Sequence, residues 1–101
     1  MSKHTGGGKF GRVQNSWPFV KLIIDPDRVS MSTILQEVTL KREFIQQIIV
    51  SRCFVNYRFI FVHNDPMAKK DIEFWTFSPG PVKNALRLQG YPVSEDKQAA
   101  G

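Results

Sequence analysis

Few side chains in this sequence could do covalent or metal chemistry, and they are scattered. His63 precedes the turn Asn64-Asp65-Pro66, where a histidine ring usually bonds to nearby backbone. The only cysteine, Cys53, follows Arg52, which could activate the thiol, although an inert buried or half-buried thiol is the favoured interpretation. Catalysis needs a nucleophile and a base that converge, and a structural zinc site needs about four ligands. We therefore predict no enzyme, no metal site and no cofactor.

The length and composition are typical of one small globular domain. The chain has 101 residues, of which 42% are hydrophobic, enough for one core but not for two. A single cysteine excludes an internal disulfide and fits a reducing compartment. The sequence contains no run of about 18 apolar residues, which argues against a membrane span, and its start lacks the apolar core of a signal peptide. We expect a cytoplasmic protein.

The basic charge is concentrated near the N-terminus. Of the net charge of +5, Lys3, Lys9 and Arg12 contribute three charges, and the first twelve residues contain no acid. The Gly6-Gly7-Gly8 run in the same segment is typical of a mobile chain. We therefore predict a flexible, basic, Gly-rich tail over residues 1–12.

The remaining sequence divides into a folded part and a short end. We predict a single domain over residues 13–93 and a polar C-terminal tail over residues 94–101. The sequence after the basic tail carries a net charge of only +2. Nucleic acid is therefore not the expected partner of the folded part.

One helix is clearly encoded near the C-terminus. Ser78 stands where its hydroxyl can cap the first turn, and Pro79 suits the first helical position. Val82 and Leu86 then recur on one face at the helical period. Gly90 can take the left-handed conformation that ends a helix. The apolar stripe is narrow, so we expect this helix to dock on a sheet.

The sequence before the helix is typical of short strands separated by turns. Alternation of apolar and polar side chains predicts six strands, at residues 19–24, 28–33, 36–41, 46–53, 57–63 and 71–77. With a helix at about residues 79–89, the pattern indicates an α+β fold that is mainly antiparallel β. We expect a six- to seven-stranded barrel, or crossed sheets, capped by the one C-terminal helix. The pattern leaves open a further strand near residues 10–14.

Several segments share a combination of residues typical of one superfamily. They are Trp17-Pro18-Phe19, Leu40-Lys41-Arg42-Glu43-Phe44-Ile45, Phe74-Trp75-Thr76-Phe77-Ser78-Pro79, Leu86 and Gly90-Tyr91-Pro92-Val93. The pattern resembles the pleckstrin-homology-like (PH-like) barrels, in particular small bacterial proteins of that superfamily. This resemblance implies a module that binds lipid headgroups, peptides or other proteins, and some similar proteins assemble into rings. Fold likeness alone does not fix the function.

One departure from that superfamily bears on lipid binding. Lipid-binding members surround their first hairpin with Lys and Arg side chains that hold phosphates. Here Asp25 and Asp27 place two carboxylates in the corresponding turn, and only Lys21 and Arg28 stand near them. Repulsion between these carboxylates and a phosphate opposes headgroup binding.

A candidate partner interface is formed by apolar side chains that remain when the core is assigned by alternation. Six of them point to the opposite side of the sheet: Phe19, Ile23, Ile49, Ile60, Val62 and Trp75. A contiguous apolar patch marks an interface, so we predict a protein partner or a homo-oligomer. Phe77 points the same way, and for Trp75 and Phe77 cover by the helix and loops is an equal alternative. Peripheral binding of the basic tail to anionic membrane lipid headgroups is the alternative function.

Overall fold

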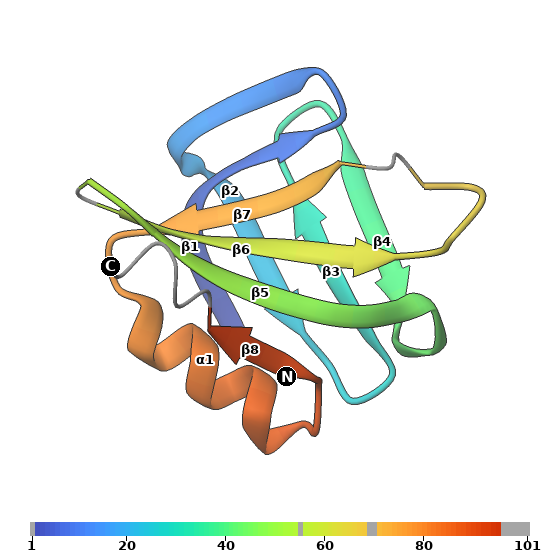
Figure 1. Cartoon of the computed structure of the whole chain (residues 1–101). Helices are drawn as coiled ribbons and strands as arrows, with labels where there is room; N and C mark the ends of the chain where they lie inside the picture. The colour runs from blue at the N-terminus through green and yellow to red at the C-terminus, as the bar shows by residue number, and fades with distance from the viewer. Residues whose placement is uncertain (1, 55, 69–70, 96–101) are drawn as a thin grey trace.

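The computed structural model describes residues 2–54, 56–68 and 71–95. Eight strands, one 3-10 turn and one α-helix are present in this part of the chain (Figure 1). Their bounds are β1 Ser2–Phe10, β2 Val13–Ile24, β3 Arg28–Ser32, β4 Glu37–Lys41, η1 Arg42–Phe44, β5 Ile45–Cys53, β6 Asn56–His63, β7 Ile72–Thr76, α1 Pro79–Leu88 and β8 Val93–Glu95.

All eight strands belong to one curled sheet in the order β4-β3-β2-β1-β7-β6-β5-β8. Two antiparallel meanders, β1 to β4 and β5 to β7, are joined where β1 pairs with β7, and β8 adds a short parallel edge to β5. The result is a half-barrel with α1 beside its opening (Figure 1). The α+β architecture, the predominance of antiparallel pairing and the single C-terminal helix are confirmed. The count of six to seven strands was too low.

The predicted flexible tail was wrong, because Ser2–Phe10 is an interior strand of the sheet. β1 pairs with β2 on one side and with β7 on the other. Gly6, Gly7 and Gly8 are buried, and a Cβ added at Gly7 would overlap the Trp75 indole. The glycine run therefore allows a close approach of β1 to β7, whereas composition alone suggested flexibility.

The start of β2 differs from the prediction for a related reason. The strand begins at Val13, and Gly11, with φ of +66°, forms the turn that connects it to β1. Gly6 pairs with Val20 and Gly8 with Asn15, so residues 16–19 bulge opposite the single residue Gly7. The further strand sought near residues 10–14 is thus the junction of two longer strands.

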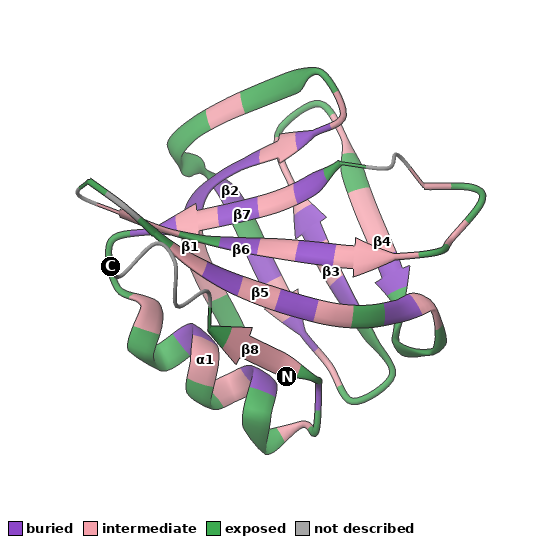
Figure 2. Ribbon diagram, in the orientation of Figure 1, coloured by how far each residue is buried: buried purple, intermediate pink, exposed green. Residues whose placement is uncertain are grey.

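The core fills the concave side of the half-barrel. Buried residues alternate with less buried ones along β3, β6, β7 and the second half of β2, as Figure 2 shows by the purple bands on the ribbons. Phe59 of β6 and Phe74 of β7 lie opposite each other in register, with ring centres 6.4 Å apart. The fully buried aromatic and aliphatic side chains include Phe10, Val20, Leu22, Ile24, Val29, Met31, Leu40, Ile48, Phe59, Phe74 and Leu86.

Helix α1 closes over this core with the side chains that its period predicts. It runs from Pro79 to Leu88, and Val82 and Leu86 are buried. The predicted side-chain cap was wrong, because the Ser78 hydroxyl makes no capping bond. Instead, the backbone N–H of Ser78 donates to Oγ1 of Thr76 at 3.1 Å. Gly90 has a φ of +80° and ends the helix as expected.

The beginning of the predicted C-terminal tail is also part of the sheet. Ser94 and Glu95 extend β8, where Ser94 lies beside Ile49 of β5. Residues 96–101 lie outside the described part of the chain.

Candidate binding surface

The two histidines have structural partners. Nδ1 of His63 accepts a hydrogen bond from the backbone N–H of Asp65 at 3.2 Å, as expected for a histidine in a turn. His4 shares a 3.1 Å hydrogen bond with Ser2 Oγ, and burial lowers the pKa of His4. In the described ranges, no three His, Cys, Asp or Glu side chains lie close enough to hold a metal ion. The Cys53 side chain lies outside the described part.

An apolar patch lies on the outer face of β5 and β6. Ile49 is directly opposite Ile60 in the antiparallel register, and Val62 follows on the same face of β6. All three side chains are half-buried, whereas their inward neighbours Phe59 and Phe61 are fully buried. No described helix or loop crosses this face in Figure 1. Three of the six predicted interface residues therefore lie together.

Trp75 belongs to a different cluster. Its ring centre is 6.0 Å from that of Phe77, and Phe77 is also 6.0 Å from Trp17 in the β2 bulge. Both pairs meet edge to face, an arrangement that the quadrupole of aromatic rings favours. The Trp75 ring lies over the backbone of Gly7, so β1 covers part of it. We call Trp17, Trp75 and Phe77 the aromatic cluster.

The other two predicted interface residues, Phe19 and Ile23, belong to neither group and lie on β2. Phe19 is 58% exposed at the end of the β2 bulge and lines a groove of about 360 Å³ with Ile34 and Leu35 of the β3–β4 turn. Ile23 is half-buried on the outer face of β2 between Lys3 and Ser30. The six residues thus do not form one surface.

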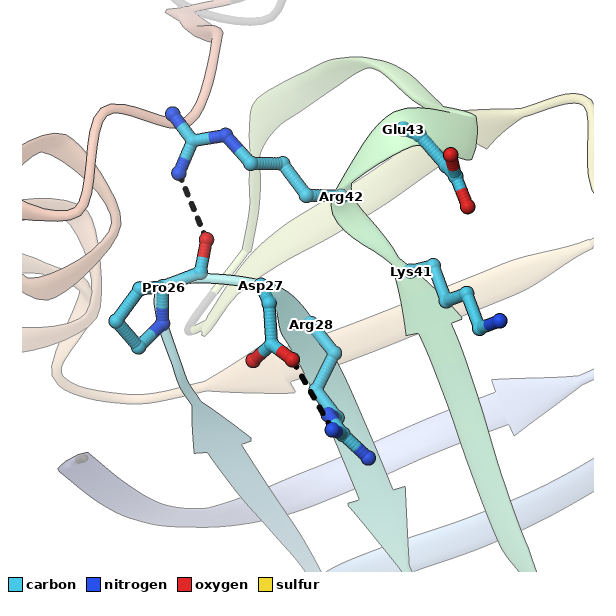
Figure 3. Close-up of a pocket in the computed structure, with 6 residues that line it drawn as sticks. All are labelled: Pro26, Asp27, Arg28, Lys41, Arg42 and Glu43. Carbon is cyan, nitrogen blue, oxygen red and sulfur yellow. Dashed lines mark hydrogen bonds and ion pairs between the residues drawn. The ribbon is translucent and has the colours of Figure 1, made fainter.

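A groove of about 740 Å³ lies at the turns after β2 and β4 (Figure 3). Its wall includes three cations, Arg28, Lys41 and Arg42. Arg28 donates to the Asp27 carboxylate at 3.0 Å, which lowers the pKa of Asp27 through that hydrogen bond. The Asp27 carboxylate therefore engages a cation that a phosphate would need, which adds to the repulsion expected from the sequence.

Arg42 in the same groove holds the end of α1 in place. Its guanidinium donates to the backbone carbonyls of Pro26 at 2.9 Å, Gln89 at 2.5 Å and Gly90 at 2.8 Å. It also lies 4.8 Å from the centre of the Tyr91 ring. These contacts explain why Arg42 turns away from Lys41 and Glu43 in Figure 3. Arg42 in this groove therefore joins the β2–β3 turn to the end of α1, and its guanidinium is engaged by backbone carbonyls instead of being available to a phosphate.

No protein-family model matches this chain, and a search among curated proteins found no significant similarity.

The sequence analysis did not predict that Trp17, or the pair Ile34 and Leu35, would be exposed apolar side chains next to predicted interface residues. Trp17 was noted only as part of a motif, because the bulge that brings it to Phe77 depends on pairing with a glycine. Exposed Ile34 and Leu35 form the tip of the β3–β4 turn. The adjacent apolar pair within a turn is the signal that could have revealed them. Among the described residues, no helix is long and apolar enough to cross a membrane.

Proposed function

We propose that the chain is a non-catalytic PH-like binding module that self-associates through the outer face of β5 and β6. The observation that carries this proposal is the contiguous patch of Ile49, Ile60 and Val62. Side chains of this type on an uncovered sheet face favour contact with another protein surface. A second copy of the chain supplies a matching patch through two-fold symmetry.

The PH-like part of the proposal is supported by topology. Two antiparallel meanders meet at β1 and β7, and the helix follows directly after β7. The additional edge strand β8 is a departure from the seven strands that the resemblance implied. Within this superfamily the protein is proposed to bind proteins, because its turn after β2 is poorly suited to phosphate.

The size of the patch sets the expected strength of association. Specific interfaces bury about 1,200–2,000 Å² in total, more than three aliphatic side chains supply. Neighbours on the same face, such as Gln47 and Arg58, are therefore expected to form a polar rim. We expect a reversible dimer with a dissociation constant in the micromolar range.

Light scattering coupled to size exclusion tests the interface. The wild-type chain should have a mass above that of the monomer, and Ile60→Lys should reduce the mass while circular dichroism stays unchanged. Leu88→Lys is the matched control, since Leu88 is 86% exposed on α1, away from β6. A monomeric wild type, or an unchanged mass for Ile60→Lys, contradicts the proposal.

Peripheral membrane binding through a basic tail is supported less well than self-association. Lys3 and Lys9 belong to β1 and cannot extend towards a bilayer as a mobile segment. The groove at the first hairpin also has its arginines engaged by Asp27 and by backbone carbonyls.

A further inference from the structure

The basic residues near the N-terminus lie on the outer face of the sheet. Lys3 and Lys9 lie on the outer face of β1, because Gly6, Gly8 and Phe10 face the core. Lys21 of β2 is on the same face beside Thr5, and its ammonium donates to Thr5 Oγ1 at 2.9 Å. Basic residues that composition assigned to a tail are thus fixed on a rigid surface.

The aromatic cluster lies among these cations. Arg58 of β6 is directly opposite Trp75, and Lys3 borders a recess with Trp17 and Phe77. Trp17 is 48% exposed and Phe77 51% exposed, so both rings have accessible surface. The outer surface of β1, β2, β7 and β6 therefore combines aromatic rings with Lys3, Lys9, Lys21 and Arg58. We call it the basic aromatic surface.

The acidic residue on this surface, Glu73, lies close to two cations. Glu73 is opposite Lys9 in the pairing of β1 with β7. Its carboxylate also accepts a 3.5 Å contact from Arg58. Four cations against this one carboxylate leave a net positive field around the rings, and such a field attracts an extended anion.

We propose that the basic aromatic surface binds single-stranded nucleic acid. Unpaired bases stack on exposed aromatic side chains while Lys and Arg neutralise the phosphates. A duplex does not suit this surface, because its bases are stacked on one another and present only their edges. The shared chemistry is an anionic backbone with free base faces, which RNA and DNA strands both provide.

The recess beside the rings gives the proposed strand a place to bind. It has a volume of about 380 Å³ and lies between β1, the β2 bulge and the start of α1. Trp17, Phe77 and Lys3 are among the residues that line it. We infer that one base enters here, against the rings, while its phosphate contacts Lys3 or Lys21.

This surface adjoins the patch proposed for self-association, because Arg58 and Ile60 lie on the same face of β6. Ile49, Ile60 and Val62 lie on β5 and β6, whereas Trp17 lies on β2, Trp75 on β7 and Phe77 directly after β7. The two proposals depend on different side chains, the aliphatic patch and the aromatic cluster, so each can fail without the other. Mass measurements address the first, and oligonucleotide binding at fixed protein mass addresses the second.

Fluorescence anisotropy with labelled strands of about 12 nucleotides, within the range of known single-strand site sizes, tests the proposal. We expect RNA and DNA strands of mixed sequence to bind with a dissociation constant of about 1–100 μM, and the duplex to bind more weakly. With three to four phosphate contacts, raising the salt from about 50 to 200 mM should weaken binding about 20- to 50-fold.

Conservative variants separate stacking from charge. Phe77→Leu removes the ring but stays apolar and should weaken single-strand binding by about fivefold or more, whereas Phe77→Tyr should retain it. Lys21→Gln should weaken binding and reduce its dependence on salt. Arg87→Gln, on the exposed side of α1, is the charge control and should bind like the wild type.

Several results would overturn the proposal. These are absence of binding to single strands at low salt, equal binding by Phe77→Leu and the wild type, or a duplex bound as tightly as the strand. Two other anionic ligands are tested as competitors of the labelled strands. One is a vesicle that contains an anionic phospholipid, and the other is a free acidic peptide. If either binds through Phe77 while the strands do not, the surface has a different partner and the proposal fails.

Discussion

The guanidinium carbon of Arg42 lies 4.8 Å from the centre of the Tyr91 ring. Through this contact the turn after β4 is held against the chain that leaves α1. The hydroxyl of Tyr91 continues the connection, because it donates to the carbonyl of Asp25 at 2.6 Å. Two side chains thus join the β2–β3 turn, the β4–β5 turn and the C-terminal end of the helix.

Removal of Arg42 should loosen this junction. Arg42→Ala is expected to lower the free energy of unfolding by about 1–3 kcal/mol, because a charged donor to three carbonyls and a cation–π contact are lost. Urea unfolding measures the change. Arg12→Ala, on an exposed turn, should stay within about 0.5 kcal/mol. Full stability of Arg42→Lys would contradict the junction, since an ammonium cannot reproduce the planar fork.

Tyr91 should make the protein sensitive to alkali. Burial, the largest cause, raises the pKa of Tyr91 to about 12 from its ordinary value of 10. Because the folded state holds the proton more tightly, its contribution to stability is complete below about pH 10 and is lost as the pH rises towards 12. Urea midpoints measured across this range should fall more steeply for the wild type than for Tyr91→Phe. Parallel curves would show that Tyr91 is ionised as easily in the folded state as in the unfolded state.

Two leucines of α1 give a test of docking within one helix. Leu86 is fully buried and Leu88 is 86% exposed. Leu86→Ala should cost about 2–5 kcal/mol, whereas Leu88→Ala should change stability by less than about 0.5 kcal/mol. Equal effects in chemical denaturation would mean that the helix does not pack through the face described.

Two glycines should respond to alanine in opposite directions. A Cβ at Gly7 meets the Trp75 indole and lies 2.8 Å from the carbonyl of Asn15, while a Cβ at Gly80 has no atom within 4 Å. Gly7→Ala should therefore cost about 1–3 kcal/mol or more, and Gly80→Ala should stabilise the protein by about 0.4–1 kcal/mol. Thermal unfolding of both variants, measured together, checks the sign of each effect.

The sequence pattern predicted α1, β6 and β7 because these elements are determined by residues that are close to one another in the chain. Val82, Leu86 and Gly90 define α1 within a single stretch, and the alternation around Phe59 and Phe74 defines β6 and β7. These elements depend on neighbours a few residues away. Only the detail of the cap at Ser78 failed, where a backbone donor and Thr76 replace the expected hydroxyl bond.

The N-terminal strand could not be predicted in the same way, because its stability comes from distant partners. Gly6 to Gly8 have no strand propensity, yet Gly7 fits under Trp75. The same contact determines the outer face, since it places Lys3 and Lys9 beside the aromatic rings. The six predicted interface residues shared a facing direction, but alternation along a strand does not reveal which strands are neighbours.

The pairing of Gly7 with Trp75 also has a consequence for biosynthesis. β1 precedes β7, its second neighbour in the sheet, by most of the length of the domain, so β1 is synthesised well before β7. Until that neighbour emerges, one edge of the nascent hairpin stays unsatisfied and open to misassembly. Completion of the sheet is therefore expected to wait for the synthesis of β7 and to be governed by a non-local closure step.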